Sequence, residues 1–488
     1  MSRLVAVSQR VWLPDEPGGA GGLARSVRAA LVEHGGLWFG WDGTVAGPDS
    51  RLPQSRQHDG VEYLTLPMPA ALHADAYLGF SNDVLWPTLH GLAPPRSPVP
   101  LAARYSAYRA QCRAWATTLR PRLQATDLVW IHDYQLLPLA AALRARGHLG
   151  PIGFFLHVPF PPAARWRELP MHAALLRELL ACDVVGFQTV DDLGHFADTA
   201  RMLPGVTLEE DGTRLRSGPW RTALRVRPVG VDVDALQARV ASTSREAGDP
   251  RDAGARLRER LGGRRCIAGI DRLDYTKGLV ERITAYDEWL TRHPGAAAHT
   301  AFLQVAAPSR GSLPAYTRTA ADVAAAVDAC NRRHGCARHE PVVLLQQVLA
   351  HDAVLDLLAA ARVACVTPRR DGMNLVAQEF VAVQPPGDPG VLSLSRGAGV
   401  ARTLTDALQV DGADPGEIHA ALTQALQMPA DERRRRHASM LAALRRHSLA
   451  QWHGSFVADL ACAASRARPA QRSRMRPALL SVTRPTGT

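Results

Sequence analysis

The chain of 488 residues has a single lysine, Lys277, among 57 residues that are lysine or arginine. Positions that need only a positive charge therefore use arginine. An ammonium group is a compact point charge, whereas guanidinium is a wide planar fork, so a tight pocket around a phosphate oxygen can accept lysine and exclude arginine. The alternative is the chance survival of a surface lysine. The chemistry of the residues around Lys277 distinguishes these two interpretations.

Three further absences exclude whole classes of protein. No run of about 18 consecutive apolar residues occurs, so we expect no membrane span. The N-terminal segment has no long apolar stretch or cleavage site of a secretory signal. Seven cysteines, scattered from Cys112 to Cys462, do not form the disulfide framework of a small secreted domain. We therefore expect a cytoplasmic protein with reduced thiols.

Neither a metal site nor a nucleic-acid site is expected. The cluster Cys330, His334, Cys336 and His339 lacks the C-x2-C pairs of structural zinc sites, and a polar loop after a helix explains it better. The net charge is +11, but the basic residues are spread along the chain, and the densest groups have no interleaved aromatic residues. Such a surface would instead attract anionic sugar phosphates and nucleotides.

Short apolar runs alternate with amphipathic helical stretches, a pattern typical of parallel sheets wound with helices on both faces. The runs that we predict to be strands are 4–7, 128–131, 152–156, 184–187, 266–270, 301–305, 342–345, 363–366 and 391–394. The series occurs twice, so the predicted fold class is α/β with two Rossmann-like doubly wound domains.

We predict the domains as 1–228 and 229–445, and a helix over 446–464 that returns to the first domain. An irregular region at about 203–228, rich in turn residues, would close the first domain. Residues 465–488 are rich in Arg, Pro, Ala and Ser without apolar periodicity, which predicts a disordered basic tail.

Polar residues follow the predicted strands at their carboxyl ends, where wound sheets bind ligands. They are His132, Asp133, His157, Asp271, Arg272 and the loops 308–311 and 369–372. A glycine-rich segment, 17–23, follows the first strand and could bring backbone amides close to a phosphate. It is not a G-x-G-x-x-G motif, which disfavours a nicotinamide cofactor, and glycine-rich loops are often only connectors.

Two motifs point to a nucleotide sugar. Arg272 and Lys277 could both reach one diphosphate and neutralise charge on a leaving nucleotide without a metal; the alternative is ion pairing with Asp271 or Asp274. In the stretch 370–379, Asp371 can accept bonds from sugar hydroxyls and Glu379 from ribose. The alternative there is a helix with Asp371 as its N-cap, which leaves Glu379 unexplained.

The chain resembles the trehalose-6-phosphate synthases, which are retaining glycosyltransferases of the GT-B fold. The resemblance runs from Arg3 to about residue 460. It is carried by the segments 35–41, 80–82, 84–87, 130–134, 153–161, 186–189, 272–278, 309–311 and 370–379. It implies a GT-B architecture with two facing domains, and glucose transfer from a nucleoside diphosphate glucose, UDP-glucose in the first instance, to glucose 6-phosphate.

The resemblance also implies a role for individual residues of this chain. The acceptor site would comprise Arg10, Tyr77, Trp86, Asp133 and Arg310. The donor site would comprise Gly21, Gly22, Arg272, Lys277, Leu349, Asp371, Gly372, Met373, Asn374, Leu375, Val376 and Glu379. The catalytic set would be His157, Arg272, Lys277 and Asp371. In this mechanism the two cations stabilise the departing diphosphate, and no metal or other cofactor is required.

The chain departs from the family pattern at Thr403, where the family tends to have a glutamate. Two alternatives stay open: a synthase with another acceptor, such as a glucosylglycerol-phosphate or pseudo-disaccharide phosphate synthase, and a sugar-phosphate sensor with little turnover. A glycosidase would need two facing carboxylates, and Asp371 has no clear partner. The partners expected are small-molecule substrates, no nucleic acid and no membrane. Homo-oligomerisation stays open, and a separate trehalose-phosphate phosphatase would act downstream.

Overall fold

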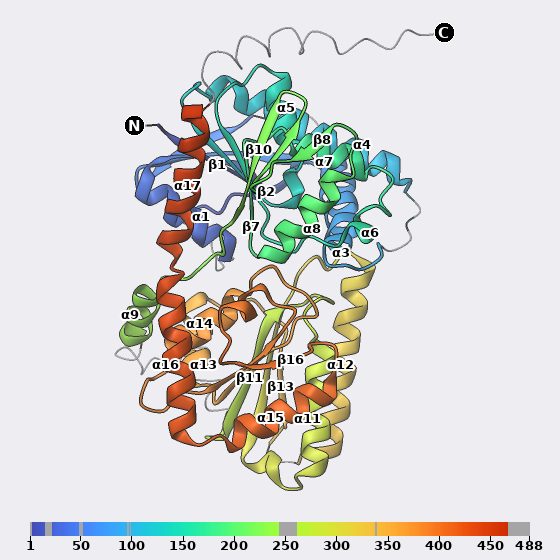
Figure 1. The fold of residues 1–488 in the computed structure, drawn as a ribbon. Coiled ribbons are helices and arrows are strands. Elements are labelled where there is room, and N and C mark those ends of the chain that lie inside the picture. The colour runs from blue at the N-terminus through green and yellow to red at the C-terminus, as the bar shows by residue number, and fades with distance from the viewer. Residues whose placement is uncertain are drawn as a thin grey trace. The chain divides into compact units, whose positions relative to one another are not determined.

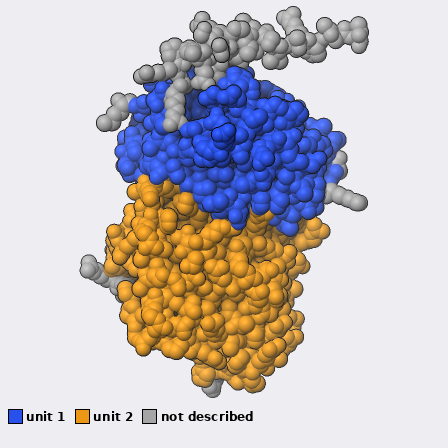
Figure 2. Space-filling model, in the orientation of Figure 1, with its two compact units in different colours: residues 1–16, 22–227, 453–488 blue, residues 17–21, 228–452 orange. Residues whose placement is uncertain are grey.

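The computed structural model describes residues 2–14, 22–47, 52–94, 97, 99–243, 261–336 and 339–466. These residues form two compact units, which Figure 2 colours separately. Unit 1 contains the described residues up to Arg227 together with those from His453 onward. Unit 2 contains the described residues from Pro228 to Trp452. Each unit is built on its own sheet (Figure 1).

The sheet of unit 1 has ten strands in the order β3-β4-β2-β1-β5-β6-β7-β10-β9-β8. Its strands are β1 (Leu4–Arg10), β2 (Gly36–Ala46), β3 (Gln54–His58), β4 (Val61–Pro69), β5 (Leu128–His132), β6 (Ile152–Phe155), β7 (Val184–Phe187), β8 (Val206–Leu208), β9 (Arg214–Ser217) and β10 (Trp220–Val226). The seven strands from β4 to β10 in this order pair in parallel, and β3, β9 and β8 extend the edges antiparallel.

Helices cover this sheet. They are α1 (Gly22–His34), α2 (Ala70–Leu72), α3 (Trp86–Leu89), α4 (Leu101–Leu119), α5 (Leu139–Ala145), α6 (Ala163–Trp166), α7 (His172–Leu179), α8 (Val190–Arg201) and α17 (Leu449–Arg466), with the π-helix η1 (His73–Leu85) and the 3₁₀ turns η2 (Arg120–Arg122) and η3 (Tyr134–Leu136). Every residue of β5, β6 and β7 is buried. A parallel strand covered on both faces needs such a continuous apolar run.

The C-terminal helix α17 packs on the centre of the sheet of unit 1. Its Phe456 stacks on Trp130 with ring centroids 4.7 Å apart. Two glycines make room for this ring, because a Cβ atom would lie 2.7 Å from it at Gly153 and also 2.7 Å from it at Gly186. Asp459 of the same helix accepts hydrogen bonds from two arginines at the end of β10 and just after it. The last described helix therefore completes the core of the first unit.

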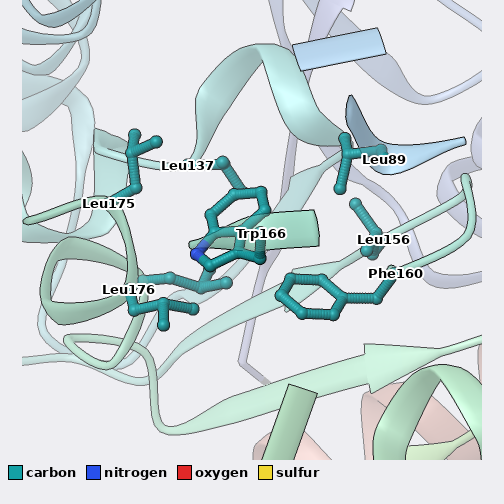
Figure 3. Close-up of a pocket in the computed structure, with 8 residues that line it drawn as sticks. Leu89, Leu137, Leu156, Phe160, Trp166, Leu175 and Leu176 are labelled. Atoms are coloured by element: carbon teal, nitrogen blue, oxygen red, sulfur yellow. The ribbon is translucent and has the colours of Figure 1, made fainter. Parts of the chain in front are cut away.

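A small pocket in unit 1 is lined only by apolar side chains (Figure 3). The lining residues are Leu89, Leu137, Leu156, Phe160, Trp166, Leu175, Leu176 and Leu179. Trp166 lies among the leucines, and its indole N–H donates to a backbone carbonyl 3.3 Å away. A sugar phosphate needs polar partners, so this pocket belongs to the core rather than to a substrate site.

Unit 2 has a six-stranded sheet in the order β13-β12-β11-β14-β15-β16, and all its pairs are parallel. The strands are β11 (Arg265–Arg272), β12 (Thr300–Ala307), β13 (Val342–Leu345), β14 (Val363–Val366), β15 (Val391–Ser395) and β16 (Leu408–Val410). The helices are α9 (Val233–Thr243), α11 (Leu279–Arg292), α12 (Pro314–His334), α13 (His351–Ala360), α14 (Leu375–Val383), α15 (Pro415–Gln427) and α16 (Ala430–Arg446), with 3₁₀ turns η4 (Ala296–Ala298) and η5 (Gly399–Arg402).

The two faces of this sheet form two separate cores. Ala268 and Ile270 of β11 belong to the core that α9, α13, α14 and α16 cover. Ile267, on the opposite face of the same strand, packs in the core that α11, α12 and α15 cover. This alternation follows from the period of two along a strand, and it produces the doubly wound arrangement.

All nine predicted strands are present, and the α/β prediction is confirmed. The prediction of an irregular region at about 203–228 is wrong, because β8, β9 and β10 lie there and β10 pairs with β7. Its turn residues connect short antiparallel strands rather than interrupting the sheet. The predicted tail falls almost entirely on residues 467–488, which lie outside the described residues. No helix among the described residues is long and apolar enough to cross a membrane.

Candidate functional site

Polar residues gather at one edge of the sheet in unit 1, as the sequence predicts. Arg10 ends β1, Asp133 follows β5, and His157 comes two residues after β6. These three strands are parallel neighbours, so their carboxyl ends meet at one edge. Asp133 has φ of 74°, outside the usual range for a residue with a side chain, and strained backbone is commonly associated with functional sites.

Arg10 is surrounded by aromatic rings. Its guanidinium carbon lies 5.3 Å from the ring centroid of Trp12 and 6.0 Å from that of Trp41. The Trp41 ring in turn lies 5.4 Å from Tyr77, which is on the π-helix η1. Cation–π contacts of this kind orient a guanidinium while its N–H groups remain donors. Two predicted acceptor residues, Arg10 and Tyr77, are thus brought together through a tryptophan.

A buried hydrogen-bond network ties the other predicted acceptor residues to this group. Tyr134 donates from its hydroxyl to Asn82 Oδ1 at 2.7 Å, and Asn82 Nδ2 donates to the carbonyl of Tyr77 at 2.9 Å. The Trp86 ring lies 5.7 Å from the Tyr134 ring. Trp86 is buried, so it supports the site through packing. Sequence reasoning missed Asn82 and Tyr134 as connecting residues, although both lie in segments that carry the family resemblance.

The partly buried His157 and the fully buried His132 form an imidazole pair with Nε2 and Nδ1 3.1 Å apart. Burial lowers the pKa of His157 to about 3. Burial and the neighbouring His157 also lower the pKa of His132 well below its usual value. Both rings are therefore neutral near pH 7, with one nitrogen donating and the other accepting. The backbone N–H of His157 donates to Asp133 Oδ1 at 3.2 Å, so these two predicted residues meet as well.

In unit 2 the lone lysine meets the predicted sugar-binding carboxylate. Lys277 Nζ lies 2.5 Å from Asp371 Oδ2, although the residues are 94 positions apart. Asn374 Nδ2 donates to the same oxygen at 3.1 Å. The sequence left open an ion pair of Lys277 with Asp271 or Asp274. The direct ion pair in the structure is with Asp371 instead. Two predicted donor motifs thus converge in one place.

The acids Asp271 and Asp274 pair with arginines instead. Asp271 Oδ2 accepts from the fully buried Arg282 at 2.8 Å. Burial raises the pKa of Asp271, and the cations of Arg282 and Lys277 oppose the rise. Asp274 lies 3.5 Å from Arg310 Nη1. These two acids position neighbouring cations, a role that strand-end reasoning from sequence did not assign to them.

Asp274 is the centre of a second buried network. Its Oδ1 accepts from the backbone N–H and hydroxyl of Thr276, and its Oδ2 accepts from the Tyr316 hydroxyl at 3.1 Å. Burial raises the pKa of Asp274, but the charges of Arg310 and Arg272 and the hydrogen bond from Thr276 lower it more. The pKa of Asp274 is therefore below its usual value. The carboxylate is therefore charged, and it fixes Arg310, which has φ of 49° and also donates to Tyr316.

The stretch from Asp371 to Glu379 forms a turn and a helix start. The helix α14 begins at Leu375, and its N-cap is Asn374, whose Oδ1 accepts from the N–H of Ala377 at 3.0 Å. The alternative in which Asp371 is the N-cap is therefore wrong, and its carboxylate faces Lys277 instead. Gly372, Met373, Leu375 and Val376 complete this turn and the first helical residues.

Glu379 is buried in α14 and has a histidine partner. Its Oε1 lies 2.9 Å from Nε2 of His351, the first residue of α13. Leu349, the predicted residue near the nucleotide base, lies two residues before this histidine and packs against the core. Sequence reasoning did not find His351, and its only signal was its place just after the predicted base-binding segment.

The remaining predicted residues are placed as follows. Arg272 is the last residue of β11, and its side chain is exposed. Thr403 directly follows η5, and its N–H donates to the carbonyl of Val400. Gly22 begins α1. Gly21 lies outside the described residues. The substrate roles of all these residues stay predictions.

Comparisons with known proteins agree with the resemblance. Residues 11–462 match glycosyltransferase family 20. A trehalose-6-phosphate synthase of Salmonella paratyphi B is 38% identical over 466 residues, covering 94% of this chain and 95% of the relative. The crystal structure of a UDP-forming alpha,alpha-trehalose-phosphate synthase from Burkholderia vietnamiensis has a TM-score of 0.90 at 37% identity, covering 96% of this chain and 99% of that one.

A second crystal structure of a UDP-forming synthase, from Burkholderia xenovorans, was determined in complex with glucose-6-phosphate. It has a TM-score of 0.88 at 35% identity and covers 94% of this chain and 100% of that chain. The family model covers well over half of the chain, and the fold agrees over nearly all of it, so the GT-B fold class is confirmed. The chain belongs to glycosyltransferase family 20.

Proposed function

We propose that this protein is a retaining glucosyltransferase that transfers glucose from UDP-glucose to glucose 6-phosphate and forms α,α-trehalose 6-phosphate. The observation that carries the proposal is the meeting of Lys277, Asp371 and Asn374 in unit 2. A phosphate-binding cation and a sugar-binding carboxylate are needed side by side at the bond that breaks in a nucleotide sugar. The named activity of the relatives, and the glucose-6-phosphate bound to one of them, support the same choice.

In the proposed mechanism the acceptor hydroxyl oxygen attacks the anomeric carbon on the face that the phosphate leaves. The bond between this carbon and the phosphate oxygen breaks, its electron pair stays on UDP, and the acceptor proton passes to the departing phosphate. Lys277 and Arg272 stabilise the growing negative charge. Asp371 orients the glucosyl hydroxyls, and in free enzyme it holds the ammonium in place. No step of this proposed mechanism uses a metal or other cofactor.

His157 serves in this proposal as a neutral hydrogen-bonding group. Its burial and its low pKa keep the ring uncharged near pH 7, so it would position the transferred glucose rather than protonate it. Arg10 and Arg310 would bind the phosphate of the acceptor, and Tyr77, Trp86 and Asp133 would shape the hexose site. Glu379 would accept from the ribose of UDP, with His351 holding its carboxylate.

Incubation with UDP-glucose and glucose 6-phosphate tests the proposal, with UDP release and the mass of the product as readouts. Glycerol 3-phosphate serves as the competing acceptor. If product forms with glycerol 3-phosphate but not with glucose 6-phosphate, the protein is a glucosylglycerol-phosphate synthase instead. Calorimetric binding of glucose 6-phosphate without nucleotide release from any donor would favour the sensor reading that Thr403 keeps open. UDP release that requires glucose 6-phosphate supports the proposal.

The proposal places the enzyme in the cytoplasm, where nucleotide sugars are made. Its partners are then its two small-molecule substrates rather than nucleic acid or a membrane. Free trehalose would require a separate phosphatase to hydrolyse the phosphate ester of the product. Fractionation of cells, with the activity followed in the fractions, tests the location.

A further inference from the structure

Two histidines and a glutamate of unit 1 lie close together. They belong to the helices α1 and α17, which are labelled in Figure 1. Glu33 and His34 are the last two residues of α1, and His453 lies near the start of α17. One ligand atom from each residue lies within 4.8 Å of the others. None of the three belongs to the proposed acceptor, donor or catalytic sets, so the proposed function does not explain them.

The distances within this group are close to those of a coordination shell. His453 Nε2 is 3.5 Å from Glu33 Oε2, and His34 Nε2 is 3.8 Å from Glu33 Oε1. Ligand atoms of a tetrahedral zinc ion, with bonds of about 2.0–2.2 Å, lie about 3.3 Å apart. The two imidazole rings meet edge to face with centroids 5.6 Å apart, and each has a nitrogen near the same carboxylate. A small inward rotation of exposed side chains would complete the shell.

The surroundings favour a cation over a simple ion pair. Nδ1 of His453 is buried without a hydrogen-bond partner among the described residues, so no other group fixes its tautomer. The last carbonyl groups of α1 add partial negative charge at this end of the helix.

We propose that Glu33, His34 and His453 bind a divalent transition metal ion of the zinc type, which ties α17 to α1 within unit 1. Two imidazoles and a carboxylate are a ligand set that such ions prefer. His453 is almost fully buried, whereas Glu33 and His34 are partly exposed, so an ion can enter from solvent and water can take the fourth position. The site lies outside the proposed substrate-binding residues, and its role is to anchor the C-terminal helix.

Titration of the chelator-treated full chain with Zn²⁺ by calorimetry tests this proposal. We expect one ion to bind per chain, with an affinity that falls by about tenfold or more in His34→Ala and in Glu33→Gln. His58→Ala is the matched control, because this exposed histidine also lies beside a carboxylate in unit 1 but outside the cluster. The affinity of the control variant should equal that of the wild type. His453→Ala should abolish binding. If this change at a buried residue prevents folding, the result for His34→Ala is decisive instead.

Co²⁺ spectroscopy separates this site from a competing one in unit 2, where Cys336 Sγ lies 3.2 Å from His339 Nδ1. Ligand-field bands without a thiolate-to-cobalt charge-transfer band are expected for two imidazoles and a carboxylate. The Tm of the wild type should rise with Zn²⁺, and that of His34→Ala should rise less at the same concentration. No binding by the wild type, binding that survives both His34→Ala and Glu33→Gln, or a thiolate band that accounts for all the bound cobalt would each overturn the proposal.

Discussion

The two units prepare their strand ends for ligands in different ways. In unit 2, charged groups pair below the surface: Asp271 with Arg282, Asp274 with Arg310, and Lys277 with Asp371. In unit 1, the corresponding edge is held by aromatic rings around Arg10 and by a neutral imidazole pair. A diphosphate leaving group gains charge during reaction, so it needs cations that are already positioned. In the proposed function the hexose ring of the acceptor gains no charge, so aromatic rings and neutral hydrogen-bonding groups would suffice for it, while Arg10 would bind its phosphate.

The buried pairs of unit 2 are expected to show the largest effect. Arg282→Met leaves the Asp271 carboxylate buried without its guanidinium, so we expect unfolding free energy to fall by about 3–5 kcal/mol. Arg445→Met is the matched control, because its ion pair with Asp234 is exposed and lies in the same unit. It should cost under about 1 kcal/mol. Denaturant unfolding measures both, and equal losses would remove the distinction between the buried and the surface pair.

Removal of the ammonium should damage catalysis more than folding. In the proposed mechanism Lys277 stabilises the leaving diphosphate, so Lys277→Ala should lower kcat/KM by about 10²–10³-fold. Lys277→Arg should recover little of this loss, because a planar fork cannot replace a point charge beside Asp371. Arg333→Ala, on an exposed ion pair of the same unit, should leave the rate unchanged. A value of Lys277→Ala within about threefold of wild type would contradict the assigned role.

The imidazole pair of unit 1 predicts a pH dependence of stability. The pKa of His157 is lowered from 6.5 to about 3, so between these values the unfolded chain binds a proton that the folded chain does not. Stability is full above about pH 6.5 and falls as the pH falls, by about 2 kcal/mol at about pH 5.

Thermal unfolding at several pH values checks this expectation. His157→Gln should lose less stability on acidification than the wild type, and His58→Gln, an exposed site in the same unit, should behave like the wild type. If all three proteins show the same slope between neutral and acid pH, the neutral pair does not contribute as described.

The smallest effect is expected at the hydrogen bond between His351 and Glu379. His351→Ala leaves the buried carboxylate without this partner, so the KM for UDP-glucose should rise about tenfold, or about 1.4 kcal/mol, with little change in kcat. His334→Ala, which removes a comparable contact to Asp287 in the same unit, is the control. A fall in kcat without a change in KM would assign His351 to another step.

Local patterns in the sequence predict part of this structure well. The apolar runs at 128–131 and 363–366 are strands because they are short, buried and β-branched or aromatic. Sequence patterns do not predict the strands β2–β4, β8–β10 and β16. Glycines interrupt the apolar pattern of β2, and β3 and β9 consist mostly of polar residues. The edge position of Asp133 and His157 follows from parallel connectivity, whereas Arg10 is expected at this site only from the family resemblance.

Partners that are distant in the chain could not be predicted. Lys277 and Asp371 are 94 residues apart, and the contact depends on how two loops of one sheet approach each other. Which arginines pair with Asp271 and Asp274 likewise depends on the packing of the interior, where an unpaired charge is costly. The N-cap of α14 is Asn374 and not Asp371, because the Asp371 carboxylate pairs with Lys277.

The ring of Phe456, seated over Gly153 and Gly186, has a consequence for how the protein is made. The strands on which it rests leave the ribosome early, but the helix that carries it emerges only after the whole of unit 2 has been synthesised. Until then the nascent N-terminal sheet exposes apolar surface that its own segment cannot cover. A chain that stops before this helix would carry that uncovered surface permanently and would aggregate.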